Sequence, residues 1–202
     1  AKILAQLLDH GKTIDVLLGN DQATVVKAYV YQTCRWFLQV EAIADKLISK
    51  PLKEKDNDVF CLLLVGLGDL LHSNNKAHAI VNETVNATRN LKKPWAKGLI
   101  NACLRSFQRE QETLLANINK NDEAKHAHPQ WFIDKIKSAW PNDWTPILNA
   151  GNHQAPMFLR VNKLKGKASD YEDHAEKIIG NNCIQLKAPI SVEQLTGFRE
   201  GH

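Results

Sequence analysis

The first 128 residues place apolar side chains at spacings of three and four and use few glycines, which is the periodicity of packed α-helices. The clearest example is the run from Phe60 to Gly68, which is apolar on nearly every side of a helix between Asp58 and Asp69. Such a helix presents no side to water, so we expect it at the centre of a bundle. The run is much shorter than the roughly 20 residues of a membrane span. We therefore expect an all-α domain over residues 1–128 and no membrane segment.

The same spacing sets the expected helices of this domain. One helix is expected near the amino terminus, and the others over the following ranges: from Val25 until Pro51, Val59–Leu71, Ala77–Leu91, and from Pro94 through Leu115. Proline suits the first turn of the last of these helices because no amide hydrogen is needed there. The polar stretch Asn117–His128 has poor periodicity and predicts a linker.

After Pro129 the pattern changes. We expect a short helix over Trp131–Trp140, a strand over Met157–Asn162, a helix over Asp170–Ile179 and a strand over Cys183–Leu186. This order predicts a small, incomplete α/β segment over residues 129–202. The chain as a whole is therefore expected to be mainly α.

Composition adds little beyond this. The chain has 202 residues, 44% of them hydrophobic and 24% charged, with a formal net charge of +4, as in ordinary globular proteins. The four cysteines are scattered singly without metal-ligand spacing, which favours small buried side chains in a reducing compartment. The amino end lacks the apolar region and cleavage site of a secretory signal, so we expect a cytoplasmic location.

The distribution of charge is more informative than its sum. Between Thr84 and Arg109 there is no Asp or Glu, whereas the same stretch holds the cations Arg89, Lys92, Lys93, Lys97, Arg105 and Arg109. At about 100° per residue, Lys97, Asn101, Arg105 and Arg109 fall within one arc of about 120°, opposite an apolar arc. Cations neutralise phosphates and amides can hydrogen-bond bases, so this face predicts RNA binding. The alternative is a solvated basic face that only keeps the protein soluble.

The glycines, histidines and tryptophans of the chain favour structural roles. Gly66 and Gly68 lie inside a continuous apolar helix without a preceding strand, which indicates helix packing and not a dinucleotide site. His126 and His128 have no third ligand nearby, so no metal site is expected. Trp131, Trp140 and Trp144 could stack on bases, but their spacing favours packing. No catalytic triad or phosphate loop is present, so the chain as given is not expected to catalyse a reaction.

Two blocks of sequence carry a resemblance to a known family. Residues 77–85 and 92–105 resemble the NusB-like helical domain that opens the RsmB (Sun/Fmu) family of ribosomal RNA small subunit cytosine-C5 methyltransferases. Residues 128–131, residues 152–162 and Gly197-Phe198 resemble the segment that joins this domain to the catalytic domain. The resemblance covers nearly the whole chain and implies a NusB-like bundle followed by a ferredoxin-like segment.

The resemblance also implies an activity for the longer protein. Members of the family transfer a methyl group from S-adenosylmethionine to C5 of a cytosine in 16S rRNA, using cysteines of a Pro-Cys and a Thr-Cys motif. Those motifs belong to a Rossmann-like domain, and this sequence stops before it, so no catalytic or cofactor residue can be assigned here. The expected partners are 16S rRNA and the protein's own carboxy-terminal catalytic domain, which would bind the cofactor. The resemblance alone adds Arg160 to the expected RNA-binding residues.

Two alternatives of other classes stay open. A free-standing NusB-like antitermination factor would bind RNA and a ribosomal protein, but it would leave residues 157–198 without a purpose. A helical protein-interaction module could instead present its basic face to an acidic partner. Only RNA binding predicts a steep dependence of affinity on salt concentration.

Overall fold

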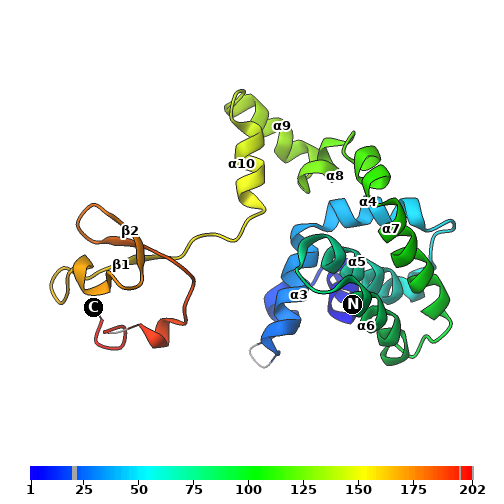
Figure 1. Ribbon diagram of the computed structural model, residues 1–202, viewed down its shortest axis with the longest axis horizontal. Coiled ribbons are helices and arrows are strands. Elements are labelled where there is room, and N and C mark those ends of the chain that lie inside the picture. The colour runs from blue at the N-terminus through cyan, green and yellow to red at the C-terminus, as the bar shows by residue number, and fades with distance from the viewer. Residues whose placement is uncertain (20–21, 196, 202) are drawn as a thin grey trace. The chain divides into compact units, whose positions relative to one another are not determined.

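Helix α5 (Asn57–His72) runs through the middle of a helical unit formed by residues Ala1–Asn152 (Figure 1). The structure is a computed structural model, and it describes residues 1–19, 22–195 and 197–201. Helices α1, α3, α4, α6 and α7 all contact α5. Leu63, Leu64 and Leu67 are fully buried within it. The predicted central helix is therefore confirmed.

The remaining helices follow the sequence pattern closely in the middle of the unit and less closely elsewhere. Their bounds are α1 Lys2–His10, α2 Ile14–Leu18, α3 Thr24–Arg35, α4 Phe37–Leu47, the 3-10 turn η1 Glu54–Asp56, α6 Ala77–Asn90, α7 Ala96–Ile118, α8 Asp122–His126, α9 Gln130–Ala139 and α10 Trp144–Gly151. The single helix expected from Val25 until Pro51 is wrong. It is two helices, because the backbone of Trp36 leaves the helical range at φ −103° and ψ 15°.

The predicted linker before Pro129 is also wrong, because it contains α8. The Asn121 side chain accepts hydrogen bonds from the amides of Glu123 at 2.7 Å and Ala124 at 3.3 Å, which caps this short helix. Contacts with α4 then hold α8 on the bundle. The cap and the exposed side of α8 consist of polar residues. The sequence of α8 therefore has no apolar periodicity that would predict a helix.

Helices α9 and α10 belong to the helical unit, so the structure divides after Asn152, whereas the sequence indicated a division after His128. Three contacts tie α9 and α10 to α8. Glu123 accepts from the amide of Gln130 at 2.6 Å, Lys137 pairs with Asp122 at 2.6 Å, and Asn152 donates to the carbonyl oxygen of His126 at 2.7 Å. No helix among the described residues is long and apolar enough to cross a membrane.

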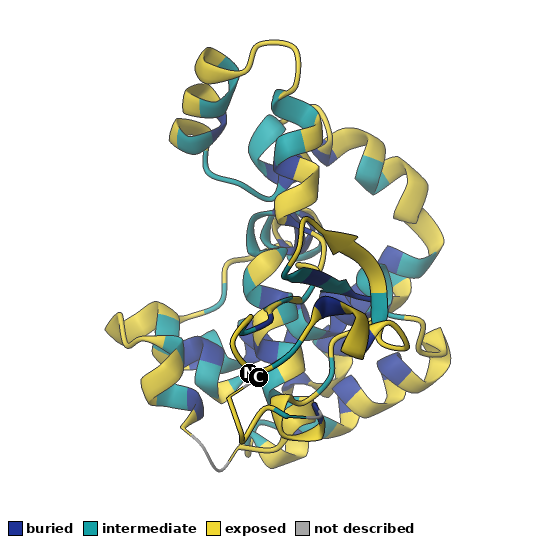
Figure 2. Ribbon diagram, turned by 90° about the vertical axis from the view of Figure 1, so that its left-hand side faces the viewer, coloured by how far each residue is buried: buried dark blue, intermediate teal, exposed yellow. Residues whose placement is uncertain are grey.

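The core of the helical unit lies where α4, α5, α6 and α7 face one another. Figure 2 shows buried residues along the facing sides of the helices and exposed residues on the outer sides. Phe107, Ile43 and Leu104 are among the fully buried side chains. The predicted packing role of Gly66 is borne out by its contact with α6, since a Cβ atom there would lie 2.9 Å from Thr84 Cγ2.

The second unit, residues 153–202, contains a three-stranded antiparallel sheet. Its strands are β1 Phe158–Arg160, β2 Ala175–Ile179 and β3 Cys183–Leu186, in the order β1-β3-β2. The strands predicted at Met157–Asn162 and Cys183–Leu186 are confirmed, although the first is shorter than expected. A mainly α chain with a small sheet-containing segment is therefore confirmed.

The helix expected over Asp170–Ile179 is wrong. That range holds a 3-10 turn, η2 (Ala168–Tyr171), followed by strand β2. Gly180 has φ 60° and begins the tight turn of a β-hairpin, in which Ile179 pairs with Cys183 and Ile178 with Ile184. The Gly-Asn-Asn sequence that resembles a helix stop is therefore a hairpin turn, whose glycine permits the left-handed conformation.

Candidate nucleic-acid interface

A groove between α6 and α7 brings together three of the residues expected to bind RNA. It encloses about 440 Å³ and is lined by Val81, Asn82, Val85, Lys97, Gly98, Asn101 and Arg105. Lys97, Asn101 and Arg105 are exposed on α7, and Asn82 faces them from α6. No acidic residue lines the groove. We call this surface the α6–α7 groove.

Asn82 is the lining residue that sequence reasoning missed. It lies outside the carboxylate-free stretch, and no periodicity argument shows which side of α6 will face α7. Its side chain also accepts a hydrogen bond from Asn86, at 3.4 Å, one turn further along α6. The groove therefore combines cations from one helix with amides from both.

The two sides of α7 differ as its sequence indicates. Ile100, Leu104 and Phe107 are completely buried, whereas Lys97 and Arg105 are exposed. The first turn of α7 contains no acidic residue, although carboxylates are the side chains favoured at the positive end of a helix dipole. Lys97 occupies that turn instead, so the amino end of α7 has an unbalanced positive charge.

The cations around the groove have no acidic partners. Among the described ranges, no carboxylate oxygen comes within 4.0 Å of these cations: Arg89, Lys92, Lys97, Arg105 and Arg109. The same holds for Arg160, which belongs to the second unit. Arg105 donates to the Gln108 side chain at 3.2 Å, and Arg109 donates to the Ser106 hydroxyl at 2.9 Å. These neutral partners orient the guanidinium groups and leave their charge available to an anion.

Lys92 stands at a position that usually holds glycine. Its φ of 58° is left-handed, and its amide donates to the carbonyl of Arg89 at 2.9 Å where α6 ends. Helices often end with a glycine in this conformation, since a Cβ atom is strained there. A lysine here accepts backbone strain and presents a cation at the corner between α6 and α7.

Lys93 is placed differently from the other predicted cations. Its ammonium lies 2.6 Å from Asp58 Oδ1 and 3.0 Å from Asp56 Oδ1, and it also donates to the carbonyl of Lys55. Desolvation opposes its charge, but hydrogen bonds and attraction from Asp58 and Asp56 outweigh that effect and raise the pKa of Lys93. Lys93 thus fastens the α6–α7 connection to the start of α5, and two carboxylates balance its charge.

We expect Lys93→Met to lower the free energy of unfolding by about 2 kcal/mol, because Asp56 and Asp58 would lose the cation that lies between them. Denaturant unfolding measures this change, and the exposed Lys92→Gly variant is the control. That control should be at least as stable as the wild type, since it removes left-handed strain. A Lys93→Met variant as stable as the wild type would show that the pair contributes little.

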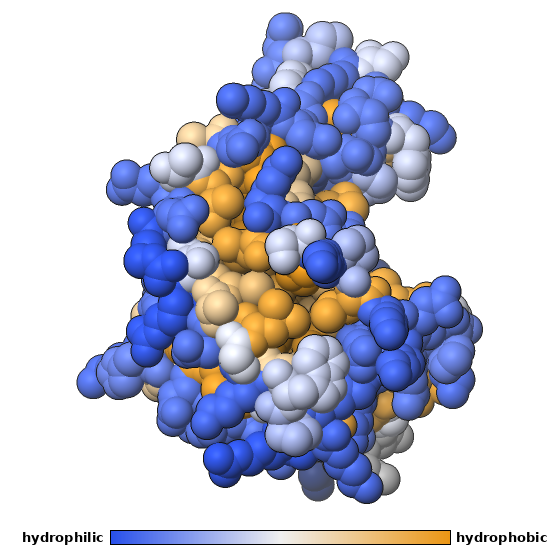
Figure 3. All heavy atoms as spheres, turned by 90° about the vertical axis from the view of Figure 1, so that its right-hand side faces the viewer, coloured by the Kyte–Doolittle hydropathy of each residue, from blue (hydrophilic) through white to orange (hydrophobic). Residues whose placement is uncertain are grey.

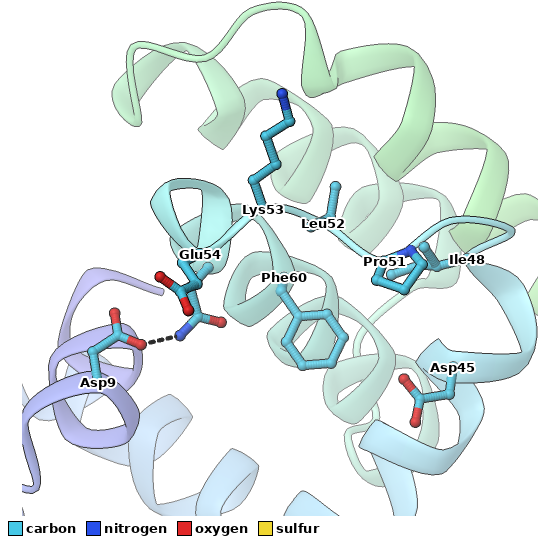
Figure 4. Close-up of a pocket in the computed structure, with 9 residues that line it drawn as sticks. Asp9, Asp45, Ile48, Pro51, Leu52, Lys53, Glu54 and Phe60 are labelled. Atoms are coloured by element: carbon cyan, nitrogen blue, oxygen red, sulfur yellow. Dashed lines mark hydrogen bonds between the residues drawn. The ribbon is translucent and has the colours of Figure 1, made fainter.

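A second cavity carries acidic side chains, which the α6–α7 groove lacks. Figure 3 shows apolar side chains exposed in a hollow that is surrounded by hydrophilic ones. A cavity of about 620 Å³ is lined by Asp9, Asp45, Ile48, Pro51, Leu52, Lys53, Glu54, Asn57 and Phe60. In Figure 4, Asp9 and Glu54 lie on one side of Phe60 and Asp45 lies on the other. Three carboxylates against one ammonium repel phosphate, so this cavity does not suit RNA.

Two of the three tryptophans after α7 are more exposed than the expected packing role requires. Trp131 and Trp140 are 63% and 51% exposed, so packing does not account for them. Trp144 is half-buried, with Lys137 Nζ at 4.2 Å from its ring centre. His126 is buried against Trp144 and is therefore a core side chain. No group of three metal-ligating side chains occurs in the described part of the chain.

The two glycines of α5 and the four cysteines differ in how far the fold buries them. Gly66 and Gly68 are buried in the middle of α5, where they cannot form a phosphate-binding loop. The four cysteines are free; Cys61 and Cys103 are buried and Cys34 and Cys183 are half-buried. Burial raises the pKa of Cys61 to about 12, so its thiol stays protonated. Cys61 therefore does not suit the role of a nucleophile.

Two family models match separate parts of the chain. Residues 1–109 match the family model described as the NusB family. Residues 128–193 match the model described as the ferredoxin-like domain of RsmF/B-like methyltransferases. The second match begins at His128, so it includes α9 and α10 as well as the sheet.

Curated relatives resemble the chain along its whole length. The "Probable ribosomal RNA small subunit methyltransferase B" of Coxiella burnetii is 46% identical over 212 residues, covering 100% of this chain and 49% of the relative. The "Ribosomal RNA small subunit methyltransferase B" of Pasteurella multocida is 40% identical over 215 residues, covering 100% of this chain and 48% of the relative. The chain thus spans about half the length of these relatives. The resemblance drawn from the sequence is confirmed, and the chain belongs to the NusB family.

Proposed function

We propose that this chain is the amino-terminal, RNA-recognising part of a 16S rRNA cytosine-C5 methyltransferase. The α6–α7 groove would hold rRNA, with Lys92, Lys97 and Arg105 on phosphates and Asn101 within reach of base edges. Arg89 and Arg109 would extend the contact along α6 and α7. Lys93 is left out of this set because Asp56 and Asp58 balance its charge.

The observation that carries the proposal is the absence of carboxylates from the α6–α7 groove, where α7 also lacks an acidic first turn. Unpaired cations on a protein surface gain most from an anion that releases condensed counterions, as the nucleic-acid backbone does. An acidic protein could meet the same charges, but the names of the relatives favour rRNA.

Catalysis is assigned to a part of the longer protein outside this chain. There, S-adenosylmethionine would supply the methyl group, and the residues described here would only bind and orient the RNA. We expect the reading frame beyond residue 202 to encode a Pro-Cys and a Thr-Cys motif with a glycine-rich cofactor site. A stop codon at that point would contradict the proposal. The antitermination alternative is less favoured because it leaves the ferredoxin-like match over 128–193 unexplained.

The RNA-binding part is tested by filter binding of 16S rRNA fragments to the 202-residue chain over a salt series. We expect the combined Lys92→Gly, Lys97→Gln and Arg105→Gln changes to flatten the plot of log affinity against log salt. Each lost phosphate contact should reduce the slope by about 0.7–0.9, so the combined reduction should be about 2–3.

Lys46→Gln is the matched control, since Lys46 is an exposed cation on α4 outside the groove. It should leave the salt slope within the error of the wild type. Equal slopes for the wild type and the triple variant would mean that the α6–α7 groove is only a solvated basic face.

A further inference from the structure

The small sheet has one covered face and one open face. Ile184 and Leu186 of β3 are buried, together with Val161 and Tyr171, and form the core of the second unit. Ile184 pairs with Leu159 of β1 and with Ile178 of β2, so these three side chains point to the same face. Leu159 packs against the core there, whereas Ile178 at the edge is 39% exposed. Because side chains alternate along a strand, the residues between them point to the other face.

Two rows of paired residues make up the open face. Phe158, Gln185 and Lys177 form one row across the sheet, and Arg160, Cys183 and Ile179 form the next. Phe158 is 49% exposed and Ile179 is 42% exposed. Arg160 and Lys177 are also exposed, one on each outer strand. The open face therefore carries an aromatic ring and a guanidinium on one outer strand, an amide on the central strand and an ammonium on the other outer strand.

The composition of this face suits single-stranded RNA. A base can stack on an exposed aromatic ring whatever its identity, while cations at either side hold the neighbouring phosphates. The buried centre of a protein interface is instead depleted of charged residues, and lysine in particular is uncommon there. On this face Lys177 stands in the same row as Phe158.

One carboxylate reaches the open face. Glu176 accepts a hydrogen bond from the Gln185 side chain at 3.3 Å, next to the irregular pairing between Ala175 and Lys177. Against this one carboxylate stand the two cations Arg160 and Lys177, so the charge of these three side chains sums to a positive value. Glu176 would repel a phosphate near β2. Removing its charge should therefore strengthen RNA binding, whereas removing the Phe158 ring should weaken it.

We propose that the open face of the sheet binds an unpaired RNA segment, with one base stacked on Phe158 and its neighbouring phosphates held by Arg160 and Lys177. The class of ligand rests on the proposed function, whereas the site is separate from the α6–α7 groove. Stacking on Phe158 supplies affinity that depends little on salt, and this distinguishes the contribution of Phe158 from the phosphate contacts of the groove.

The test measures binding of the 202-residue chain to a fluorescent oligouridine of about ten nucleotides and to an RNA duplex of equal length. We expect Phe158→Ala to weaken oligouridine binding about tenfold with little change in the salt slope, and to leave duplex binding unchanged. Glu176→Gln should strengthen oligouridine binding severalfold at low salt, because a repelling charge is removed.

Phe198→Ala is the matched control, since Phe198 is 50% exposed in the same unit but lies outside the sheet. It should bind as the wild type does. The inference is overturned if Phe158→Ala binds oligouridine normally, or if Phe198→Ala weakens binding equally. The triple variant of the groove tests a different site. If its salt slope is that of the wild type while Phe158→Ala binds oligouridine weakly, the groove does not bind RNA but the sheet does.

Discussion

Gly66→Val should lower the free energy of unfolding by about 3 kcal/mol, because α5 and α6 touch at this glycine. A Cβ atom at residue 66 would lie 2.9 Å from Thr84 Cγ2 and 3.2 Å from Leu104 Cδ2. Thr84 cannot turn aside easily, since its hydroxyl donates to the carbonyl of Ile80 at 2.7 Å. Overfilling a packed core forces backbone shifts or unfavourable side-chain rotamers. Denaturant unfolding followed by circular dichroism measures the change.

Gly68→Ala is the matched control, two residues along the same helix. A Cβ atom there would meet only Val40 Cγ1, at 3.9 Å, which is ordinary van der Waals contact. Alanine is also a better helix former, so this variant should be more stable than the wild type by about 0.5–1 kcal/mol. If Gly66→Val were as stable as the wild type, the close approach of α5 and α6 would be refuted.

The helices were predictable where burial alone determines them. Helix α5 is apolar on nearly all sides, so only a central position suits it, and α7 shows one apolar and one polar side. Helix α8 and strand β2 were missed because local polar chemistry forms them: the Asn121 side chain caps one, and the turn at Gly180 pairs the other with β3. Such contacts leave no periodic signal in the sequence.

The candidate site was predictable in its charge but not in its partners. The carboxylate-free stretch and the angular positions on α7 indicated Lys97, Asn101 and Arg105 directly. Nothing in the sequence places Asp56 and Asp58 beside Lys93, since 35 residues separate Asp58 from it. The pairing of Arg160 with Cys183, on the open face of the sheet, likewise depends on strand register, which only the folded sheet defines.

His72 makes the stability of the helical unit depend on pH. Its ring stacks on Trp36, with ring centres 4.0 Å apart and planes 9° apart, and its Nε2 lies 2.9 Å from Gln39 Oε1. Gln39 is itself buried, so no water competes freely for this contact. Burial lowers the pKa of His72 to about 4, below the ordinary histidine value of 6.5. The neutral ring is therefore the form that fits the folded protein.

The unfolded chain binds a proton at His72 more readily than the folded chain does. Stability is therefore complete above pH 6.5 and falls as the pH drops from 6.5 to about 4. Because the His72 ring is only half-buried and solvent screens part of its charge, we expect a loss of about 1–2 kcal/mol across this range. We expect His72→Gln to remove this contribution, so that its free energy of unfolding changes less between pH 7 and pH 4 than that of the wild type.

His78→Gln provides the comparison, because it makes the same replacement at an exposed histidine of α6. The comparison uses the difference between variants, since carboxylates titrate in the same range and contribute equally to all three proteins. Loss of the Trp36 stack will lower the stability of His72→Gln at every pH, which shifts its curve without altering the slope. A slope equal to that of the wild type between pH 6.5 and 4 would show that the folded protein accommodates a charged His72.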